Sequence, residues 1–515
     1  MKKLKPEQVL KRVEKAESRK EEWRSIFEDC YKYALPQRNL YGQYEGGGHG
    51  RSKMDDVFDS TAINSTQRFA NRLQSALFPP YRNWCTLKAG DQIPPEQRDG
   101  VARALDIYNE RMFSVIRQTN FDLAMSEFLL DLAVGTAIML IQPGDEITPV
   151  RFEAVPQFLV SLEEGPYGKI DNVYRRLRLK GEAIKQQWTD AKFPPALKDK
   201  IKADPMEDID LIEATIYLPE DDYWCYHLLW KKEEIVYREL KTSPWIVARY
   251  IKAAGEIYGR GPLLNALPDI KTINHTKKML LQNASIAISG MYTAADDGVL
   301  NPSTIRIQPG AIIPVARNGG PQGASLAPLP RSGDFNLAQI VIQDLSMGIK
   351  KIMLDDTMPP DSMSARSATE VNMRMQELAS NMGAAFGRLI TEAMIPIVSR
   401  ILFVMDQQNL IDMPLRVDGQ EVKVVPVSPL AKAQATEELT AVLQFTQMAG
   451  SLGPSGILSI NQEEMIAFVA DRLGVPQKVL NTPAQKAEQM LLAQQQMETM
   501  AQQAPTEAAP EPPAA

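Results

Sequence analysis

Residue types that usually carry chemistry are scarce in this sequence. Its 515 residues include only three histidines and three cysteines, separated by long intervals: His49, His227, His275, Cys30, Cys85 and Cys225. None of them stands in an HExxH or a Cys/His metal pattern, so no metal site is predicted. An odd number of distant cysteines argues against a disulfide framework and favours a reducing compartment.

Motifs for nucleotide binding and for acyl transfer are also missing. The chain has no Gly-x-Ser-x-Gly elbow and no GxGxxG motif after a predicted strand. The glycine-rich stretch 43–50 is followed by Arg51 and Ser52, whereas a phosphate-binding loop needs Gly-Lys before Ser or Thr. We therefore expect no catalytic residue, no metal and no cofactor, and we expect that the protein is not an enzyme.

Long apolar runs are absent as well. The longest, Leu132 to Ile141, is about half of what a helix needs to cross a bilayer, and Met1 to Leu4 leads into charged residues instead of a signal-peptide core. The formal net charge of −7 argues against an extended basic surface that grips nucleic acid tightly. We expect a soluble protein with no membrane partner.

The strongest positive pattern runs from Asp334 to Leu410. Apolar residues recur at three- and four-residue steps from Asp334 to Leu354, which predicts a helix with one buried face. Paired prolines at 359 and 360 end this pattern. The capping-box spacing of residues 367–370 predicts a second, long helix that reaches Met405 with a kink at Pro396.

Elsewhere helical and strand-like patterns are mixed, and the predicted fold class is α+β, predominantly helical, with mostly antiparallel strands. Further helices are predicted at 5–34, 59–77, 101–117, 122–132, 261–289, 428–450, 461–473 and 483–502. Strands are predicted at 137–141, 150–155, 173–179, 211–218, 223–230, 245–250, 304–307 and 311–315. The last segment, 504–515, holds four prolines and five alanines and is predicted to be disordered.

Several side chains leave two interpretations open. Asp355, Asp356 and Asp361 could bind a cation, but loop acids without ligand spacing are usually solvated. The lysines at 277, 278, 350 and 351 fit a solvated helix face or the face of a pore equally well. The methionines of the segment 371–405 are better explained as core residues than as a promiscuous binding groove.

Three groups of residues together resemble a known family. They are Asp59-Ser60-Thr61 with Leu77-Phe78-Pro79-Pro80 and Trp84, then Tyr258-Gly259-Arg260-Gly261-Pro262, then Ala365-Arg366-Ser367-Ala368-Thr369-Glu370-Val371. Their order and spacing resemble the head-to-tail connecting (portal) proteins of short-tailed, podovirus-type bacteriophages, over roughly residues 5–475.

The resemblance implies a ring, usually of twelve copies, at one vertex of the capsid. Double-stranded DNA would be packaged and ejected through its channel irrespective of sequence. The implied partners are other copies of the chain, major capsid and scaffolding proteins, the terminase and tail adaptor proteins. The implied location is the portal vertex of the virion, after assembly in the host cytoplasm.

The resemblance also implies a division of the chain. Residues 1–255 would form the wing, 256–290 and 334–354 the two stem helices, 291–333 the clip between them, and 355–365 the tunnel loop. Residues 366–427 would form the long wing helix and the strands after it, 428–480 the crown, and 481–503 a barrel helix before the disordered tail 504–515.

Two sets of site residues follow from this division. The expected channel-facing or DNA-facing residues are Lys277, Lys278, Lys350, Lys351, Asp355, Asp356 and Met358. The family-motif positions are Tyr258, Gly259, Arg260, Gly261, Pro262, Arg366, Ser367, Thr369 and Glu370. In an acidic channel that repels phosphates, isolated basic side chains would make only brief contacts with moving DNA.

Two other functions are compatible with parts of the pattern. A helical scaffolding or internal virion protein is the alternative, although it should lack the order of helix, β insertion, helix, proline loop and long helix. A packaging enzyme fits less well, because the chain has no phosphate-binding loop and no metal-ligand cluster.

Overall fold

The computed structural model describes residues 4–38, 54–289, 292–294, 326–328, 335–355, 380–412, 419–451 and 460–473, with single residues between 377 and 495. The chain divides into two compact units. The first comprises residues 1–73, 126–139 and 154–366, and the second comprises 74–125, 140–153 and 367–515.

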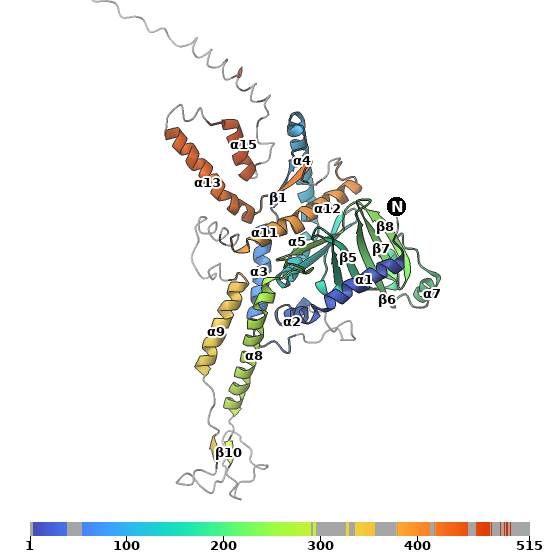
Figure 1. Ribbon diagram of the computed structural model, residues 1–515, viewed down its shortest axis with the longest axis vertical. Coiled ribbons are helices and arrows are strands. Elements are labelled where there is room, and N and C mark those ends of the chain that lie inside the picture. The colour runs from blue at the N-terminus through green and yellow to red at the C-terminus, as the bar shows by residue number, and fades with distance from the viewer. Residues whose placement is uncertain are drawn as a thin grey trace, which may run out of the picture. The chain divides into compact units, whose positions relative to one another are not determined.

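The first unit contains a five-stranded antiparallel sheet of order β4-β5-β6-β7-β8 (Figure 1). Its strands are β4 (Val160–Glu164), β5 (Ile170–Lys180), β6 (Asp208–Leu218), β7 (Tyr223–Trp230) and β8 (Glu233–Leu240). Each strand pairs with the next along the chain. Because successive side chains point to opposite faces, both faces of this sheet can be covered by helices.

Helix α1 (Pro6–Glu21) covers one face of the sheet. Its buried residues Val9, Val13 and Ala16 lie three or four positions apart and pack against Tyr174 and Ala214. These residues form one buried face of the helix. The predicted single helix 5–34 is wrong, since α1 ends at Glu21 and α2 (Arg24–Ala34) follows it.

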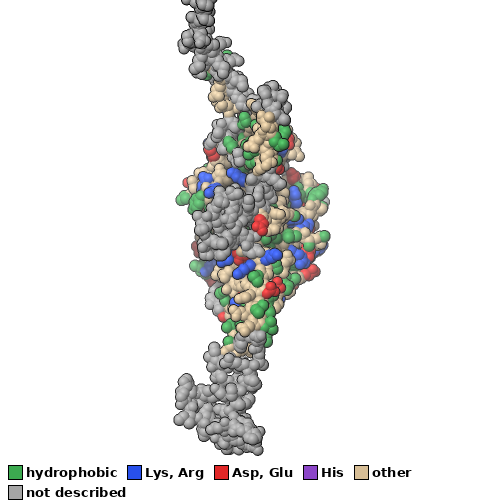
Figure 2. All heavy atoms as spheres, turned by 90° about the vertical axis from the view of Figure 1, so that its left-hand side faces the viewer, with side chains coloured by type: hydrophobic (Ala, Val, Ile, Leu, Met, Phe, Trp, Pro, Cys, Tyr) green, Lys and Arg blue, Asp and Glu red, His purple; other side chains and the backbone are tan. Residues whose placement is uncertain are grey.

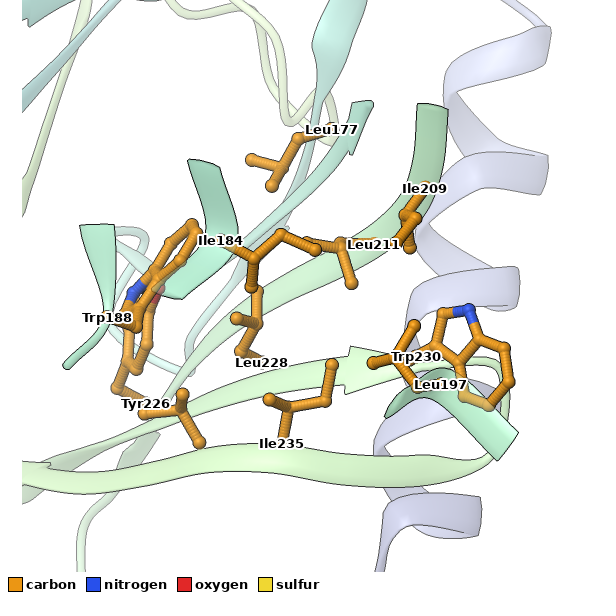
Figure 3. Close-up of a cluster of buried hydrophobic side chains, with 11 residues drawn as sticks. Leu177, Ile184, Trp188, Leu197, Ile209, Leu211, Tyr226, Leu228, Trp230 and Ile235 are labelled. Atoms are coloured by element: carbon orange, nitrogen blue, oxygen red, sulfur yellow. The ribbon is translucent and has the colours of Figure 1, made fainter. Parts of the chain in front are cut away.

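Helices α6 (Gly181–Gln187) and α7 (Pro195–Ala203) contribute to the core on the other face of the sheet (Figure 3). Ile184 and Leu197 belong to these helices and pack in one cluster with Trp188. The Trp188 indole donates to the Tyr226 hydroxyl at 3.0 Å, and this hydroxyl donates to the Glu213 carboxylate at 2.8 Å. The polar atoms of these buried aromatic residues are thus paired.

The other elements of the first unit are η1 (Pro36–Arg38), the 3₁₀ turn η2 (Gln157–Leu159), β9 (Trp245–Arg249), α8 (Pro262–Ser289), β10 (Tyr292–Ala294), β11 (Leu326–Pro328) and α9 (Phe335–Ile352). Two helices and two strands have residues in both units: α3 (Thr61–Leu77), α5 (Phe121–Val134), β2 (Thr136–Pro143) and β3 (Val150–Ala154). A three-stranded sheet has the order β3-β2-β9, with β3 at Val150–Ala154.

An aromatic cluster forms much of the core of the second unit. Trp84 is buried and lies edge-on to Phe78 and Phe113, with ring centroids 5.1 and 5.3 Å apart, and it stacks on Phe121. Beside it, β1 (Cys85–Ala89) pairs antiparallel with β12 (Val422–Pro426), and α4 (Pro95–Gln118) contacts β1. Two of the residues that carry the family resemblance, Phe78 and Trp84, are therefore core residues.

In its described part the predicted long helix 367–405 is helical from 384 onward, but it is interrupted at Gly383. Gly383 has a φ of +45°, which ends one helical stretch before α11 (Ala384–Leu389) begins. A π-helical turn (Ile390–Met394) then precedes α12 (Ile395–Gln407). The π turn lies directly before Pro396, where the missing amide donor disturbs regular hydrogen bonding, so an irregularity is present near the predicted kink.

Helices α13 (Pro429–Ser451) and α15 (Gln462–Leu473) agree with the predictions to within one residue at each end. They contact each other through an ion pair between Arg472 and Glu438 at 3.0 Å. Six of the eight predicted strands are confirmed. The other two, at 304–307 and 311–315, lie outside the described residues. Strands β1, β4, β8, β10 and β11 were not among the predicted strands.

Candidate functional site on helices α8 and α9

Helices α8 and α9 lie side by side in the first unit (Figure 1). Strand β10 follows α8, β11 precedes α9, and the two strands pair antiparallel, with Thr293 opposite Ala327. The chain therefore runs out along α8 and returns along α9. This agrees with the predicted order of a helix, an insertion that contains strands, and a second helix.

Backbone packs directly on backbone where α8 begins. A Cβ atom on Gly259 would lie 2.2 Å from the carbonyl oxygen of Gly135, and one on Gly261 would lie 2.1 Å from that of Ala133. Any side chain would clash at both positions. Pro262 then takes the first helical position, where its missing N–H leaves no partner unsatisfied. The motif thus fixes the first turn of α8 against residues 133–135.

The other two residues of this motif also make contacts inside the chain. Tyr258 is buried, its hydroxyl accepts from the Leu162 N–H at 3.3 Å, and its ring lies edge-on to Phe27. The Arg260 guanidinium donates to both carboxylate oxygens of Glu256 at 2.6 and 2.7 Å and lies 5.1 Å from the ring centroid of Trp23. In this chain, all five motif residues from 258 to 262 position α8.

The middle of α8 is hydrogen-bonded to residues 56–59, the segment that precedes α3. The Asn274 side-chain oxygen accepts from the N–H groups of Phe58 and Asp59 at 2.7 and 3.2 Å. Its amide nitrogen donates to the carbonyl oxygen of Asp56 at 2.9 Å. One buried amide therefore satisfies three backbone groups of this segment.

Two of the lysines that were expected to face a channel have partners on the same segment. Lys277 pairs with Asp59 at 2.5 Å, and the second carboxylate oxygen of Asp59 accepts from the Thr61 N–H at the start of α3. Burial raises the pKa of Asp59, but hydrogen bonds from Lys277 and Thr61 outweigh burial and hold this pKa below its ordinary value. The Lys278 ammonium lies 5.3 Å from the ring centroid of Phe58.

The C-terminus of α9 has a defined cap. The Asp355 N–H donates to the Lys350 carbonyl at 2.7 Å and the Leu354 N–H donates to the Lys351 carbonyl at 3.1 Å, which is the Schellman pattern. Leu354 occupies the position that usually holds glycine, with a φ of +55°. This conformation costs a non-glycine residue about 1 kcal/mol.

Contacts from α3 hold this cap in place. Asp355 is only 6 % exposed, and its carboxylate accepts from the Ser65 hydroxyl at 3.0 Å and pairs with Arg72 at 3.3 Å and with Arg68 at 3.4 Å. Arg72 also donates to the carbonyl oxygens of Leu354 and Asp355. We call Ser65, Arg68, Arg72 and Asp355 the α3–α9 clamp.

The clamp corrects one expectation. Asp355 was expected to be a solvated loop acid, and this is wrong, because its carboxylate is buried against α3. That this residue lies beside a channel stays a prediction. The exposed lysines Lys350 and Lys351 lie in the last turn of α9, where positive charge complements the helix dipole. The remaining expected site residues, Asp356, Met358, Arg366, Ser367, Thr369 and Glu370, lie outside the described residues.

Both helices carry exposed apolar side chains, and Figure 2 shows hydrophobic side chains at the surface of this part of the molecule. On α8 these are Met279 and Leu281, and on α9 they are Leu337, Ile340, Val341 and Met347, each at least 40 % exposed. Leu337, Ile340 and Val341 recur at three- and four-residue spacing, so they form one face of α9. This face is not covered by the described part of the chain.

Sequence reasoning missed the residues of α3 and α8 that hold the site together. Ser65, Arg68 and Arg72 lie at i, i+3 and i+7, so they share one face of α3, which a polar stripe in the sequence could have indicated. The sequence around Asn274 did not indicate its role, because its hydrogen-bond partners are more than 200 residues away in the chain.

Groups of metal-binding side chains and membrane-spanning helices are both absent from the residues that the structure describes. Within these residues, no three His, Cys, Asp or Glu side chains are grouped so that they could hold a metal ion. In the same part of the chain, no helix combines the length and apolar character needed to span a bilayer.

The sequence is similar to bacteriophage head to tail connecting and portal proteins. The family model for the bacteriophage head to tail connecting protein matches residues 6–480. The portal protein of Escherichia phage T7 is 20% identical over 396 residues, which is 73% of this chain and 70% of that protein. The probable portal protein of Bordetella phage BPP-1 is 23% identical over 501 residues, which is 90% of this chain and 85% of that protein.

A solved structure of low sequence identity is also similar to this chain. A chain in the virion of a native gene transfer agent particle is 12% identical with a TM-score of 0.36, over 85% of this chain and 99% of that chain. The family model alone spans far more than half of the sequence. The chain therefore belongs to the bacteriophage head to tail connecting protein family.

Proposed function

We propose that the protein is a phage portal subunit, which assembles into a ring at one capsid vertex and provides the channel for DNA packaging and ejection. Membership of the head to tail connecting family supports this proposal, and the observation that carries it structurally is the pair α8 and α9. Both helices are fixed to the first unit at one end, α8 exposes Met279 and Leu281, and α9 leaves the apolar face of Leu337, Ile340 and Val341 uncovered. Such faces are typical of surfaces that copies of a chain bury against one another.

In this assignment α8 and α9 are the stem helices, the residues between them form the clip, and the residues after Asp355 form the tunnel loop. Residues 1–255 belong to the wing and α13 and α15 to the crown. The proposed partners are copies of the chain in a ring of about twelve, the capsid and scaffolding proteins, the terminase, tail adaptors and double-stranded DNA. The location is the portal vertex of the virion.

Ring assembly is the first test of this function. We expect the purified protein to form closed rings without cofactor, because burial of apolar surface contributes roughly 25 cal/mol for each Å² removed from water. Replacing Ile340 and Leu337 by glutamate should prevent assembly while the thermal unfolding of the monomer stays unchanged. Light scattering and negative-stain imaging measure the first result, and circular dichroism measures the second. A wild-type protein that stays monomeric over a wide concentration range contradicts the proposal.

The proposed tunnel loop gives a second test. We expect that replacing residues 356–365 by a short Gly/Ser linker, with Asp355 kept, leaves ring formation and thermal stability within about 0.5 kcal/mol of wild type. DNA packaging or retention should fall, because the loop would no longer follow the moving duplex. Complementation of a portal-deficient phage, with capsid assembly and packaged DNA measured separately, distinguishes the two effects. Normal DNA content in the variant rules out a role of this segment in packaging.

A further inference from the structure

Two arginines of α3 reach one buried carboxylate at the end of α9, and two exposed lysines belong to the helical turn that precedes it. Arg68 and Arg72 reach Asp355 from α3, and Lys350 and Lys351 occupy the helical turn whose carbonyl groups bond the N–H groups of Asp355 and Leu354. Arg68, Arg72, Lys350 and Lys351 carry four formal positive charges against the single negative charge of Asp355, in a chain whose formal net charge is −7. A local excess of positive charge attracts polyanions, and low-dielectric surroundings strengthen that attraction.

The two arginines of the cluster differ in what they do for the chain. The Arg72 side chain is 16% exposed and bonds two backbone carbonyls besides the carboxylate, so it is committed to the cap of α9. The Arg68 side chain is 62% exposed and reaches Asp355 only at 3.4 Å. Because the Arg68 end of this pair is exposed to solvent and its distance is long, it stabilises the fold less than a fully buried ion pair does.

Asp355 does not depend on Arg68 for its burial. Its carboxylate keeps the Ser65 hydroxyl at 3.0 Å and the Arg72 guanidinium at 3.3 Å when Arg68 turns away. The free energy needed to separate Arg68 from Asp355 is therefore small. The planar guanidinium, once released, can donate two parallel hydrogen bonds to a phosphate.

We propose that Arg68, together with Lys350 and Lys351, forms a contact site for the phosphate backbone of double-stranded DNA, and that Arg68 exchanges between Asp355 and the phosphate. This inference rests on the proposed function, because it names the residues of the channel that meet the DNA. The exchange keeps each contact weak, since every phosphate competes with a carboxylate that is already in place. Weak contacts let the duplex slide, and they carry no sequence preference.

The test is DNA binding by assembled wild-type rings and by rings of Arg68→Gln, Arg68→Lys and Arg151→Gln. Arg151 is the matched control, because its side chain is 63% exposed and is paired with Asp145 at 2.7 Å. The probe is a fluorescent duplex of mixed sequence and a second duplex of unrelated sequence, measured by anisotropy between 50 and 200 mM salt, a range over which phosphate contacts weaken strongly. Thermal unfolding is followed for each variant.

For Arg68→Gln we expect an affinity lower by roughly five- to tenfold at the lowest salt and a salt-dependence slope smaller by at least about 1. Arg68→Lys should restore part of the affinity, Arg151→Gln should match wild type, and both duplexes should behave alike. Equal affinities for Arg68→Gln and Arg151→Gln overturn the inference. So does a large loss of thermal stability in Arg68→Gln, since Arg68 would then be a structural ion pair. Wild-type protein that forms no rings, or rings that bind no duplex, would count against the proposed function itself.

Discussion

Replacement of Gly261 or Gly259 by alanine is expected to destabilise the first unit by more than about 3 kcal/mol, which is among the largest effects of a single substitution. The new Cβ atom would stand 2.1 or 2.2 Å from a backbone carbonyl oxygen of residues 133–135. No side-chain rotation relieves such a clash, because both partners are backbone atoms. Either the start of α8 or the loop between α5 and β2 must move.

A matched control for these variants is Gly100→Ala. A Cβ atom on Gly100 in α4 would meet nothing within 4 Å, and alanine favours a helix by up to about 1 kcal/mol over glycine. This variant should therefore be as stable as wild type or more stable. Chemical denaturation with circular dichroism compares the three proteins. Near-wild-type stability of Gly261→Ala would show that the close backbone approach is not needed.

The second large effect is expected for Asp355→Asn. The substitution keeps the shape of the side chain but removes its charge, so Arg72 keeps a largely buried guanidinium without its carboxylate. Breaking one partner of a buried ion pair costs roughly 3 to 5 kcal/mol, and the part exposure of Arg72 to solvent reduces this to about 2 to 3 kcal/mol.

Two further variants separate the clamp from a general effect of lost charge. Asp91→Asn removes a carboxylate that is 83% exposed and paired with Lys423, and should change stability by less than about 0.5 kcal/mol. The double variant Asp355→Asn with Arg72→Gln should be less destabilised than the sum of the two single variants, because the pair acts as a unit. Additive effects in urea denaturation would show that Asp355 and Arg72 do not stabilise the cap together.

The elements around the site were largely predictable, and their contacts were not. Helices α8 and α9 match the predicted ranges because an apolar stripe at helical spacing is a local signal. The stretch from Tyr258 to Pro262, directly before α8, was singled out in the sequence as part of the family resemblance. That its glycines pack on residues 133–135 could not be predicted, because this depends on a segment more than 120 residues earlier.

The errors have similar physical causes. Asp355 follows a helix and precedes two prolines, which is typical of a solvated loop, but Ser65 and Arg72 lie nearly 300 residues away and bury it. The break in the predicted long helix was missed because apolar periodicity does not reveal the positive φ of Gly383. Strands β4 and β8 were missed because the charged residues at their ends obscure the alternation of apolar and polar side chains. These strands are stabilised by their neighbours in the sheet, which a local pattern does not show.

The cap of α9 also has a mechanical consequence. Arg72 bonds the last two carbonyl groups before residue 356 and is itself part of α3. A pull on the chain beyond Asp355 is therefore carried into α3 through several charge-assisted hydrogen bonds, which are stronger than the neutral bonds of a helix terminus. Tension applied there would load two helices together before it could unwind the last turn of α9.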